Sequence, residues 1–187
     1  MRLFVALEIP SAVRENLAAL LKKLRELSSQ PRWVRPENLH LTLKFIGEVA
    51  PEKLDAIRAA LASVRSDSQV TTHFRGLGFF PNEKRPRVFW AGTDPSPNLK
   101  KLAAHIDSVT EKIGIPREER SFSPHLTLAR LQPPGLPEKL RPAIRENLAR
   151  EFGALQTRQF HLIESKLKPS GAEYTTLESF IFARAEA

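Results

Sequence analysis

Cysteine is absent from this sequence of 187 residues. The chain therefore has no disulfide bond, no thiolate ligands for a zinc site and no thiol nucleophile. A chain without cysteine fits a reducing compartment, so we expect a cytoplasmic location.

Long apolar runs are absent as well. No segment reaches the roughly eighteen uncharged apolar residues that a membrane-spanning helix needs. The opening stretch MRLFVALEIP is interrupted by Glu8 and Pro10 and is too short for the apolar region of a signal peptide. We therefore expect a soluble protein with no membrane partner.

Linkers rich in glycine or serine and low-complexity segments are also missing. The content of 41% hydrophobic and 27% charged residues is typical of a globular protein. A chain of this length forms one ordinary domain or two small lobes that share a core. We therefore predict a single domain spanning residues 1–187, and we expect a monomer.

Positive charge exceeds negative charge. The chain has 29 Lys and Arg against 21 Asp and Glu, which leaves a formal net charge of +8. An excess of this size favours a polyanionic partner, most commonly a nucleic acid. Composition alone leaves open the alternative that the basic residues only keep the surface soluble.

Apolar periodicity predicts a mixed order of strands and helices. We expect helices at 11–27, 51–64, 96–113 and in a short segment ending near residue 151. We expect strands at 3–9, around both HLTL tetrapeptides described below, and at 70–80, 87–93, 160–167 and 174–182, with a proline-rich turn at 132–137. Because strands and helices do not alternate strictly, this order favours an α+β fold with mixed or antiparallel sheets over a doubly wound parallel sheet.

The tetrapeptide HLTL occurs twice, at His40–Leu43 and at His125–Leu128. The chain has only five histidines and nine threonines. Two His-x-Thr pairs are expected by chance in about two chains per hundred of this composition. The repeat therefore indicates a loose duplication of the two halves within one unit.

Strand alternation places the His and Thr of each tetrapeptide on one face and the leucines on the other. The leucines are expected to pack against a helix, so that the His and Thr face solvent or a cleft. If the two strands lie side by side or in facing lobes, two imidazoles and two hydroxyls converge on one space.

Other roles are common for such residues taken singly. A lone His is usually structural, Thr is favoured in strands by its β-propensity, and a zinc site would need a third ligand that neither repeat supplies. A matched pair argues against all three. Two histidines with an ordinary pKa of about 6.5 can act as one acid and one base at neutral pH, and Thr hydroxyls can donate to phosphoryl oxygens. This inventory favours metal-free cleavage of a phosphodiester.

The stretches HLTLKFIGE and SPHLTLAR resemble the paired HxTx motifs of the two-histidine (2H) phosphoesterases. More narrowly, they resemble the RNA 2′,3′-cyclic phosphodiesterases, historically called 2′-5′ RNA ligases. The opening RLFVALEIP, the stretch RVFWAG and the late EYTTLESF are similar to the same family. The resemblance implies two similar α+β lobes of mostly antiparallel sheet with outer helices, whose HxTx strands face a central cleft.

The resemblance also implies a reaction. Water opens the terminal 2′,3′-cyclic phosphate of an RNA and leaves a 2′-phosphate, and the reverse step would join RNA ends through a 2′-5′ bond. His125 would be the proton acceptor that activates water, and His40 would be the proton donor to the departing 3′ oxygen. Thr42 and Thr127 would hold the phosphate. Neither a metal nor an organic cofactor is implied.

Residues beyond the tetrapeptides are placed by parity and by resemblance. Arg130 matches a family arginine that contacts phosphate, but strict alternation puts it on the face opposite the second histidine. It reaches the cleft only if the strand twists, bulges or ends before it.

Lys44 lies an even number of residues after the first histidine, so an alternating strand would place both on the same face, although a solvent-exposed lysine is commoner. Phe45 lies an odd number of residues after the first histidine, so alternation places it with the leucines on the core side. The resemblance instead makes Phe45 and Phe4 candidates for base stacking. The remaining histidines are expected to be structural: His73, His105 and His161.

Two alternatives stay open. A non-catalytic RNA-binding module would use the same cleft and basic surface, with salt-dependent binding and no turnover. A different phosphodiesterase of the same superfamily would act on a small cyclic nucleotide, and a comparison of mononucleotide and oligonucleotide substrates separates these cases.

Overall fold

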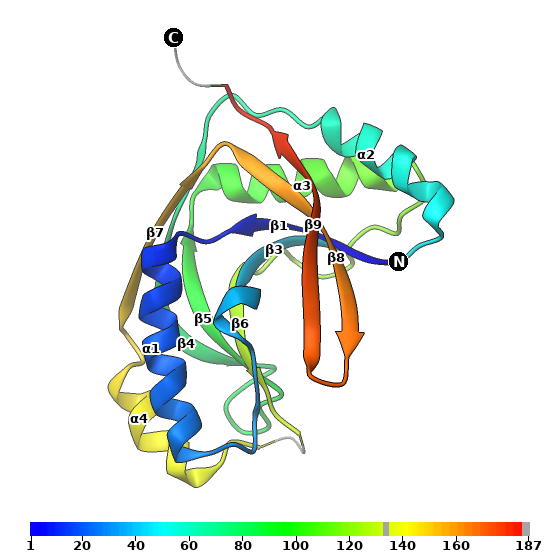
Figure 1. The fold of residues 1–187 in the computed structure, drawn as a ribbon. Helices are drawn as coiled ribbons and strands as arrows, with labels where there is room; N and C mark the ends of the chain where they lie inside the picture. Colours follow the sequence, from blue (N-terminus) through cyan, green and yellow to red (C-terminus); the bar gives the residue numbers. More distant parts are fainter. Residues whose placement is uncertain (133–134, 185–187) are drawn as a thin grey trace.

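The computed structural model describes residues 1–132 and 135–184 and contains two antiparallel sheets (Figure 1). Sheet A has the strand order β3-β1-β8-β9, and sheet B has the order β2-β6-β5-β4-β7. The strands of sheet A are β1 (Arg2–Glu8), β3 (His40–Glu48), β8 (Gln159–Lys168) and β9 (Gly171–Ile181). Those of sheet B are β2 (Arg32–Trp33), β4 (Val70–Phe80), β5 (Val88–Pro95), β6 (His125–Arg130) and β7 (Glu151–Thr157). The predicted α+β class is confirmed.

Helices cover the outer sides of both sheets (Figure 1). They are α1 (Ser11–Leu27), α2 (Leu54–Ala62), α3 (Pro97–Glu111) and α4 (Arg141–Glu146), with short 3-10 turns η1 (Pro36–Asn38), η2 (Pro51–Lys53) and η3 (Glu138–Leu140). α1 follows the expected amphipathic spacing, since its buried apolar side chains recur every three or four residues: Val13, Leu17, Leu20, Leu21 and Leu24. Within the described ranges, no helix is both long and apolar enough to cross a membrane.

The two halves of the chain are interleaved. Sheet A joins β1 and β3 to β8 and β9 from the end of the chain, whereas sheet B places β4 between β5 and β7. The helices also connect the sheets: α1 follows β1 of sheet A but packs against β7 of sheet B, and α3, which follows β5 of sheet B, contacts β3 of sheet A as well as β4 and β5. Both sheets therefore contribute to one continuous hydrophobic core.

Strand β7 was not predicted from the sequence, which indicated a helix up to about residue 151. Its buried side chains, Phe152 and Leu155, are three residues apart, a spacing that is typical of a helix. The irregular spacing arises at Gly153, which has a φ of 124° next to a register shift against β4. A Cβ at this glycine would lie 2.9 Å from Val13 of α1. The proline-rich turn expected at 132–137 lies partly outside the described residues.

Candidate active site

The two HLTL tetrapeptides begin β3 and β6, which contact each other where the two sheets meet (Figure 1). In both strands the first leucine is fully buried, while the His and Thr on either side of it stay partly exposed. The predicted alternation is therefore confirmed for the first three residues of each motif. Both motifs present an imidazole and a hydroxyl at the junction of the sheets.

Strand β3 has a β-bulge at the second leucine of its motif. Thr42 pairs with Ala6 of β1, and Lys44 pairs with the adjacent Val5. Leu43, which lies between them, therefore has no partner of its own in β1. An extra residue of this kind reverses the direction in which the following side chains point.

Strand β6 has a β-bulge at the same place in its motif. Thr127 pairs with Trp90 of β5, and Ala129 pairs with the adjacent Phe89. Leu128 is thus the extra residue, in the position equivalent to the bulged leucine of β3. The duplication therefore extends from the sequence to an irregularity of the backbone.

The bulges change where the residues beyond each motif lie. Lys44 is only 4% exposed and points to the core side, so the parity predicted for it is wrong. Phe45 is 60% exposed instead of being a core residue. In β6 the bulge brings Arg130 to the face of His125, and its charge acts on that imidazole. Arg130 was expected to reach the cleft only if its strand twists, bulges or ends before it. Strand β6 has such a bulge.

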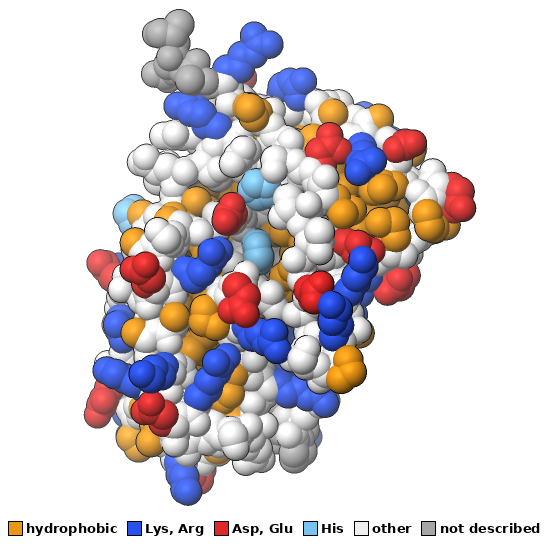
Figure 2. All heavy atoms as spheres, in the orientation of Figure 1, with side chains coloured by type: hydrophobic (Ala, Val, Ile, Leu, Met, Phe, Trp, Pro, Cys, Tyr) orange, Lys and Arg blue, Asp and Glu red, His pale blue; other side chains and the backbone are white. Residues whose placement is uncertain are grey.

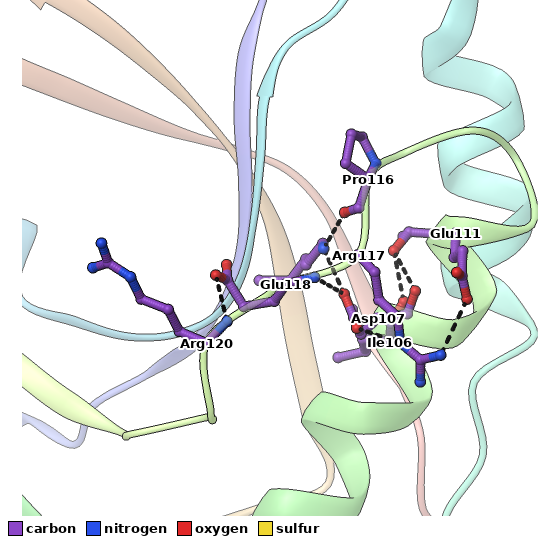
Figure 3. A network of polar contacts seen from close by, with 9 residues as sticks. Ile106, Asp107, Glu111, Pro116, Arg117, Glu118 and Arg120 are labelled. Atoms are coloured by element: carbon purple, nitrogen blue, oxygen red, sulfur yellow. Dashed lines mark hydrogen bonds and ion pairs between the residues drawn. The ribbon is translucent and has the colours of Figure 1, made fainter.

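Lys44 joins β3 to α3 and to the loop that follows this helix. Its ammonium donates to a carboxylate oxygen of Asp107 and, over 2.7 Å, to the carbonyl oxygen of Pro116. The Glu118 amide also donates to Asp107, over 3.2 Å, and Arg117 lies 3.4 Å from its second oxygen (Figure 3). Burial opposes ionisation of Asp107, but these hydrogen bonds and charges hold its pKa below the usual value. The lysine therefore has a structural partner outside the cleft.

The same backbone contact orients both histidines. Nδ1 of His40 lies 3.1 Å from the carbonyl oxygen of Asn38, and Nδ1 of His125 lies 2.8 Å from that of Ser123. Because a carbonyl oxygen can only accept, Nδ1 carries a hydrogen and donates in each case. The nitrogen that gains and loses a proton is therefore Nε2 in both rings.

Burial lowers the pKa of both imidazoles below the ordinary histidine value. Around His125, the charge of Arg130 lowers the pKa further, while the hydrogen bond to the backbone carbonyl opposes the shift. Around His40, Arg14 lowers the pKa, and the backbone carbonyl and Glu8 oppose the shift. A depressed pKa keeps an imidazole neutral at neutral pH, which suits a general base.

Aromatic rings surround His40. Its ring centroid lies 5.8 Å from that of Tyr174 on β9 and 6.4 Å from that of Phe4 on β1. Phe4 is buried beneath its neighbours and lies 6.3 Å from Phe45. Phe45 and Tyr174 thus offer the more accessible aromatic surface. Tyr174 was missed as a site residue because only the pairing of β9 with β8 and of β8 with β1 brings it here.

A third histidine lies on the same face of sheet A. His161 of β8 and Thr42 of β3 both pair with Ala6 of the strand between them. The His161 ring is buried, with Nδ1 2.8 Å from the Ser179 hydroxyl and Nε2 4.0 Å from the Glu8 carboxylate. It was expected to be structural because it lacks an HxTx context, and no local sequence pattern places it beside the motif.

Charged side chains of both signs are mixed across the face shown in Figure 2, with histidine side chains near its centre. On this face the basic side chains are therefore interspersed with acidic ones. Among residues 1–132 and 135–184, no group of three His, Asp or Glu side chains is arranged to hold a metal ion. The two motifs each present an imidazole and a hydroxyl, which are groups capable of acid–base chemistry.

Comparisons with known proteins agree with this arrangement. The family described as LigT like Phosphoesterase matches residues 7–90 and, a second time, residues 92–174. A curated RNA 2′,3′-cyclic phosphodiesterase from Archaeoglobus fulgidus is 37% identical, over 96% of this chain and 99% of its own. A crystal structure of a protein from Thermus thermophilus has a TM-score of 0.81 at 34% identity, covering 97% of this chain and 98% of its own. Escherichia coli LigT, solved with NADP+, has a TM-score of 0.76 at 27% identity, covering 98% of both chains.

Proposed function

This chain belongs to the LigT-like phosphoesterase family, and on that premise we propose that it is an RNA 2′,3′-cyclic phosphodiesterase. Water opens the cyclic phosphate at the end of an RNA and leaves a 2′-phosphomonoester and a free 3′-hydroxyl. The relatives that carry this name match nearly the whole chain, which supports the reaction class. Action as a monomer in the cytoplasm remains a prediction.

The observation that carries the proposal is the matched presentation of two imidazoles. His40 and His125 begin contacting strands, and each ring is held through Nδ1 so that Nε2 is the reactive nitrogen. His125 accepts a proton from water as the water oxygen attacks phosphorus. His40 donates a proton to the 3′ oxygen as the P–O3′ bond breaks. One group must be neutral and the other protonated, as in general acid–base catalysis.

The phosphate is held by side chains from both halves. Thr42 and Thr127 stand two residues after the histidines, on the same strand faces, and donate their hydroxyl hydrogens to the non-bridging oxygens. Arg130, turned to this face by the bulge, adds a positive charge. Donors placed where charge grows in the transition state are a large source of rate acceleration.

The ribose and base of the RNA end lie on the side of His40, because the 3′ oxygen that leaves phosphorus stays on the ribose. Phe45 offers an exposed ring there for stacking against the base. Phe4 supports that ring from below. The substrate is thus held by an aromatic contact at one end and by phosphate contacts at the other.

A purely binding role is not favoured. Binding alone would not require two imidazoles held in the same orientation through Nδ1. A phosphodiesterase for small cyclic nucleotides would use the same catalytic groups. Unlike an enzyme for RNA ends, it would need no contacts beyond the first nucleoside.

The test uses an RNA oligonucleotide that ends in a 2′,3′-cyclic phosphate, incubated in EDTA with the wild type, His40→Ala and His125→Ala. We expect a 2′-phosphate product from the wild type and none from either variant. Cyclic mononucleotides run in parallel measure how far the enzyme prefers an oligonucleotide. No opening of either substrate by the wild type would refute the proposal and support the binding module.

A further inference from the structure

The carbonyl oxygen that orients each catalytic histidine is held in place differently in the two halves. Asn38 supplies this oxygen in the first half, and Ser123 supplies it in the second. The residue between the carbonyl group and the histidine is Leu39 in one case and Pro124 in the other. Whatever fixes the carbonyl group also fixes the tautomer and the direction of the imidazole ring.

In the second half the restraint is local. A residue that precedes a proline is confined to extended backbone, because the proline ring clashes with it in the helical conformation. Pro124 imposes this limit on Ser123. The carbonyl oxygen of Pro124 also accepts a hydrogen bond of 3.1 Å from the Thr93 hydroxyl of β5. The residue next to His125 is thus sufficient to hold the carbonyl group that orients this ring.

In the first half the local restraint is weaker. Asn38 ends η1, a 3-10 turn of three residues, and short turns of this kind have poor hydrogen-bond geometry. Two backbone bonds close the turn: the Asn38 amide donates to Arg35 over 2.9 Å, and the Leu39 amide donates to Pro36 over 3.2 Å. Leu39 does not limit the backbone of the preceding residue as a proline would.

A second restraint reaches η1 from the end of the chain. The side-chain amide of Asn38 donates a hydrogen bond of 2.8 Å to the carbonyl oxygen of Ala172 in β9. The guanidinium of Arg35 donates one of 2.6 Å to the carbonyl oxygen of Ser170, in the turn between β8 and β9. These two strands form one long hairpin (Figure 1). The turn that orients His40 is therefore tied to residues 134 and 135 positions away in the sequence.

We propose that Asn38 is the positioning residue of His40. Its backbone oxygen accepts the hydrogen of Nδ1, and its side-chain amide anchors that oxygen to the β8–β9 hairpin. The inference rests on the proposed function, in which His40 is the proton donor. It adds that this donor is aimed at the 3′ oxygen only while the hairpin is docked on η1. His125 has no such dependence, since the proline beside it provides the restraint.

A proton donor that is not aligned with its acceptor transfers the proton slowly. The ring nitrogen must come within hydrogen-bond reach of the leaving oxygen, and a displacement of about 1 Å costs about a hundredfold in rate. Asn38 acts through His40, so its loss should weaken an interaction that matters in the transition state and leave ground-state binding intact. The expected signature is a lower kcat with an unchanged KM.

The kinetic test compares two asparagines that each make one long-range hydrogen bond. With an RNA that ends in a 2′,3′-cyclic phosphate, Asn38→Ala should lower kcat about tenfold to a hundredfold and leave KM unchanged. Asn16→Ala is the matched control, because the Asn16 amide donates over 2.9 Å to the carbonyl oxygen of Phe152, a residue 136 positions away in β7. This control should keep the kcat of the wild type.

The tautomers of the two histidines provide a readout that needs no turnover. Nitrogen NMR at a pH where both imidazoles are neutral shows which ring nitrogen carries the hydrogen. In the wild type we expect Nδ1–H in both rings. Asn38→Ala should give a mixture of tautomers for His40 and leave His125 unchanged, whereas Pro124→Ala should do the reverse. Arg35→Ala, which removes the other bond to the hairpin from an exposed side chain, should shift His40 in the same direction by a smaller amount.

The outcomes separate this inference from the proposed function. A wild-type kcat in Asn38→Ala, with the His40 ring wholly in the Nδ1–H form, would overturn the positioning role and leave the phosphodiesterase intact. A fall in kcat that Asn16→Ala shares, with both rings unchanged, would overturn it as well, because it would indicate a general loss of stability. A wild type that opens no cyclic phosphate would refute the proposed function, and the tautomer of His40 would still decide whether Asn38 orients the ring.

Discussion

The two halves of the molecule share one backbone frame and differ in the side chains attached to it. Each half presents HLTL at the start of a strand, a bulge at the second leucine and a carbonyl oxygen two residues before the histidine. They diverge at the two residues that follow the motif. These are Lys44 and Phe45 in the first half, and Ala129 and Arg130 in the second.

The difference shows how a symmetric frame carries out an asymmetric reaction. In both halves the bulge buries the first residue after the motif and exposes the second. The exposed residue is aromatic beside His40, where the nucleoside is proposed to lie. It is cationic beside His125, where it lowers the pKa of the proposed base and adds charge for the phosphate. The backbone is thus alike in the two halves, and the proposed difference in role between the two histidines rests on the residues that diverge.

The largest effect on activity should come from removing the histidine that each half presents. His40→Ala and His125→Ala should each lower kcat/KM about a thousandfold, as expected for loss of a general acid or base. Because the two groups act as a unit, the double variant should lose little more than either single one. Steady-state kinetics gives the comparison, and unchanged melting temperatures show that the fold is retained. Near-wild-type turnover in one single variant would remove that histidine from the mechanism.

The next effect should separate the two divergent exposed residues. Arg130→Ala should lower kcat/KM about a hundredfold, because it removes charge stabilisation that grows in the transition state. Phe45→Ala should raise KM about tenfold and leave kcat nearly unchanged, because stacking holds substrate and transition state equally. If Arg130→Ala changed only KM, the phosphate role of this residue would be wrong.

A third prediction concerns the buried residue that directly follows each motif, which is Lys44 in β3 and Ala129 in β6. Lys44→Met should lower the free energy of unfolding by about 2–3 kcal/mol, because it leaves Asp107 without its main partner. Lys44→Met combined with Asp107→Leu should recover much of the loss, since no unpaired carboxylate remains. Urea unfolding measures both variants. Ala129→Gly serves as the control, because Ala129 is the equivalent buried residue of β6 and makes no ion pair.

The same pair predicts a dependence of stability on pH. The folded-state pKa of Asp107 is lowered, so its contribution is fully present above the unfolded value of about 3.9 and is lost as pH falls through the folded one. Wild type should therefore lose more stability than Lys44→Met between pH 5 and pH 3, values chosen to bracket the unfolded pKa of about 3.9. Equal losses in the two proteins would mean that the pair contributes nothing to stability.

The smallest effects should appear in the pH profile. We expect kcat/KM to be bell-shaped, with an optimum on the acid side of the ordinary histidine pKa of about 6.5, because burial lowers both pKa values. Arg130→Ala should move the acid limb to higher pH, since it relieves His125 of a positive charge. Arg14→Ala should instead move the alkaline limb to higher pH, through His40. A flat profile with chemistry limiting would contradict the acid–base assignment.

The parts of the site that depend on local pattern could be predicted. The repeat of HLTL made both histidines and both threonines candidates, and strand alternation correctly predicted which side of the first leucine they occupy. The order of helices and strands was sufficient to predict an α+β fold with antiparallel sheets. These inferences succeed because they depend only on neighbouring residues and on the period of an extended backbone.

The errors begin one residue past each motif. Lys44 was expected to face the same way as His40, and Phe45 to face the core, since an unbroken strand alternates strictly. The bulge reverses both, and it depends on the register of β1, a strand some forty residues away in sequence. Tyr174 was missed as a neighbour of His40 for a related reason, because it lies on β9, a strand that only the pairing within sheet A brings there.

The sequence by itself determined the class of fold, because this follows from residue type and periodicity, and its paired motifs pointed, through their resemblance to a known family, to the proposed catalytic groups and reaction. The tertiary structure alone decided which side chains accompany each histidine. It turned Arg130 toward His125, joined Lys44 to Asp107 and placed Tyr174 beside His40. Pairing between distant segments sets register, bulges and burial, and no stretch of sequence contains that information locally.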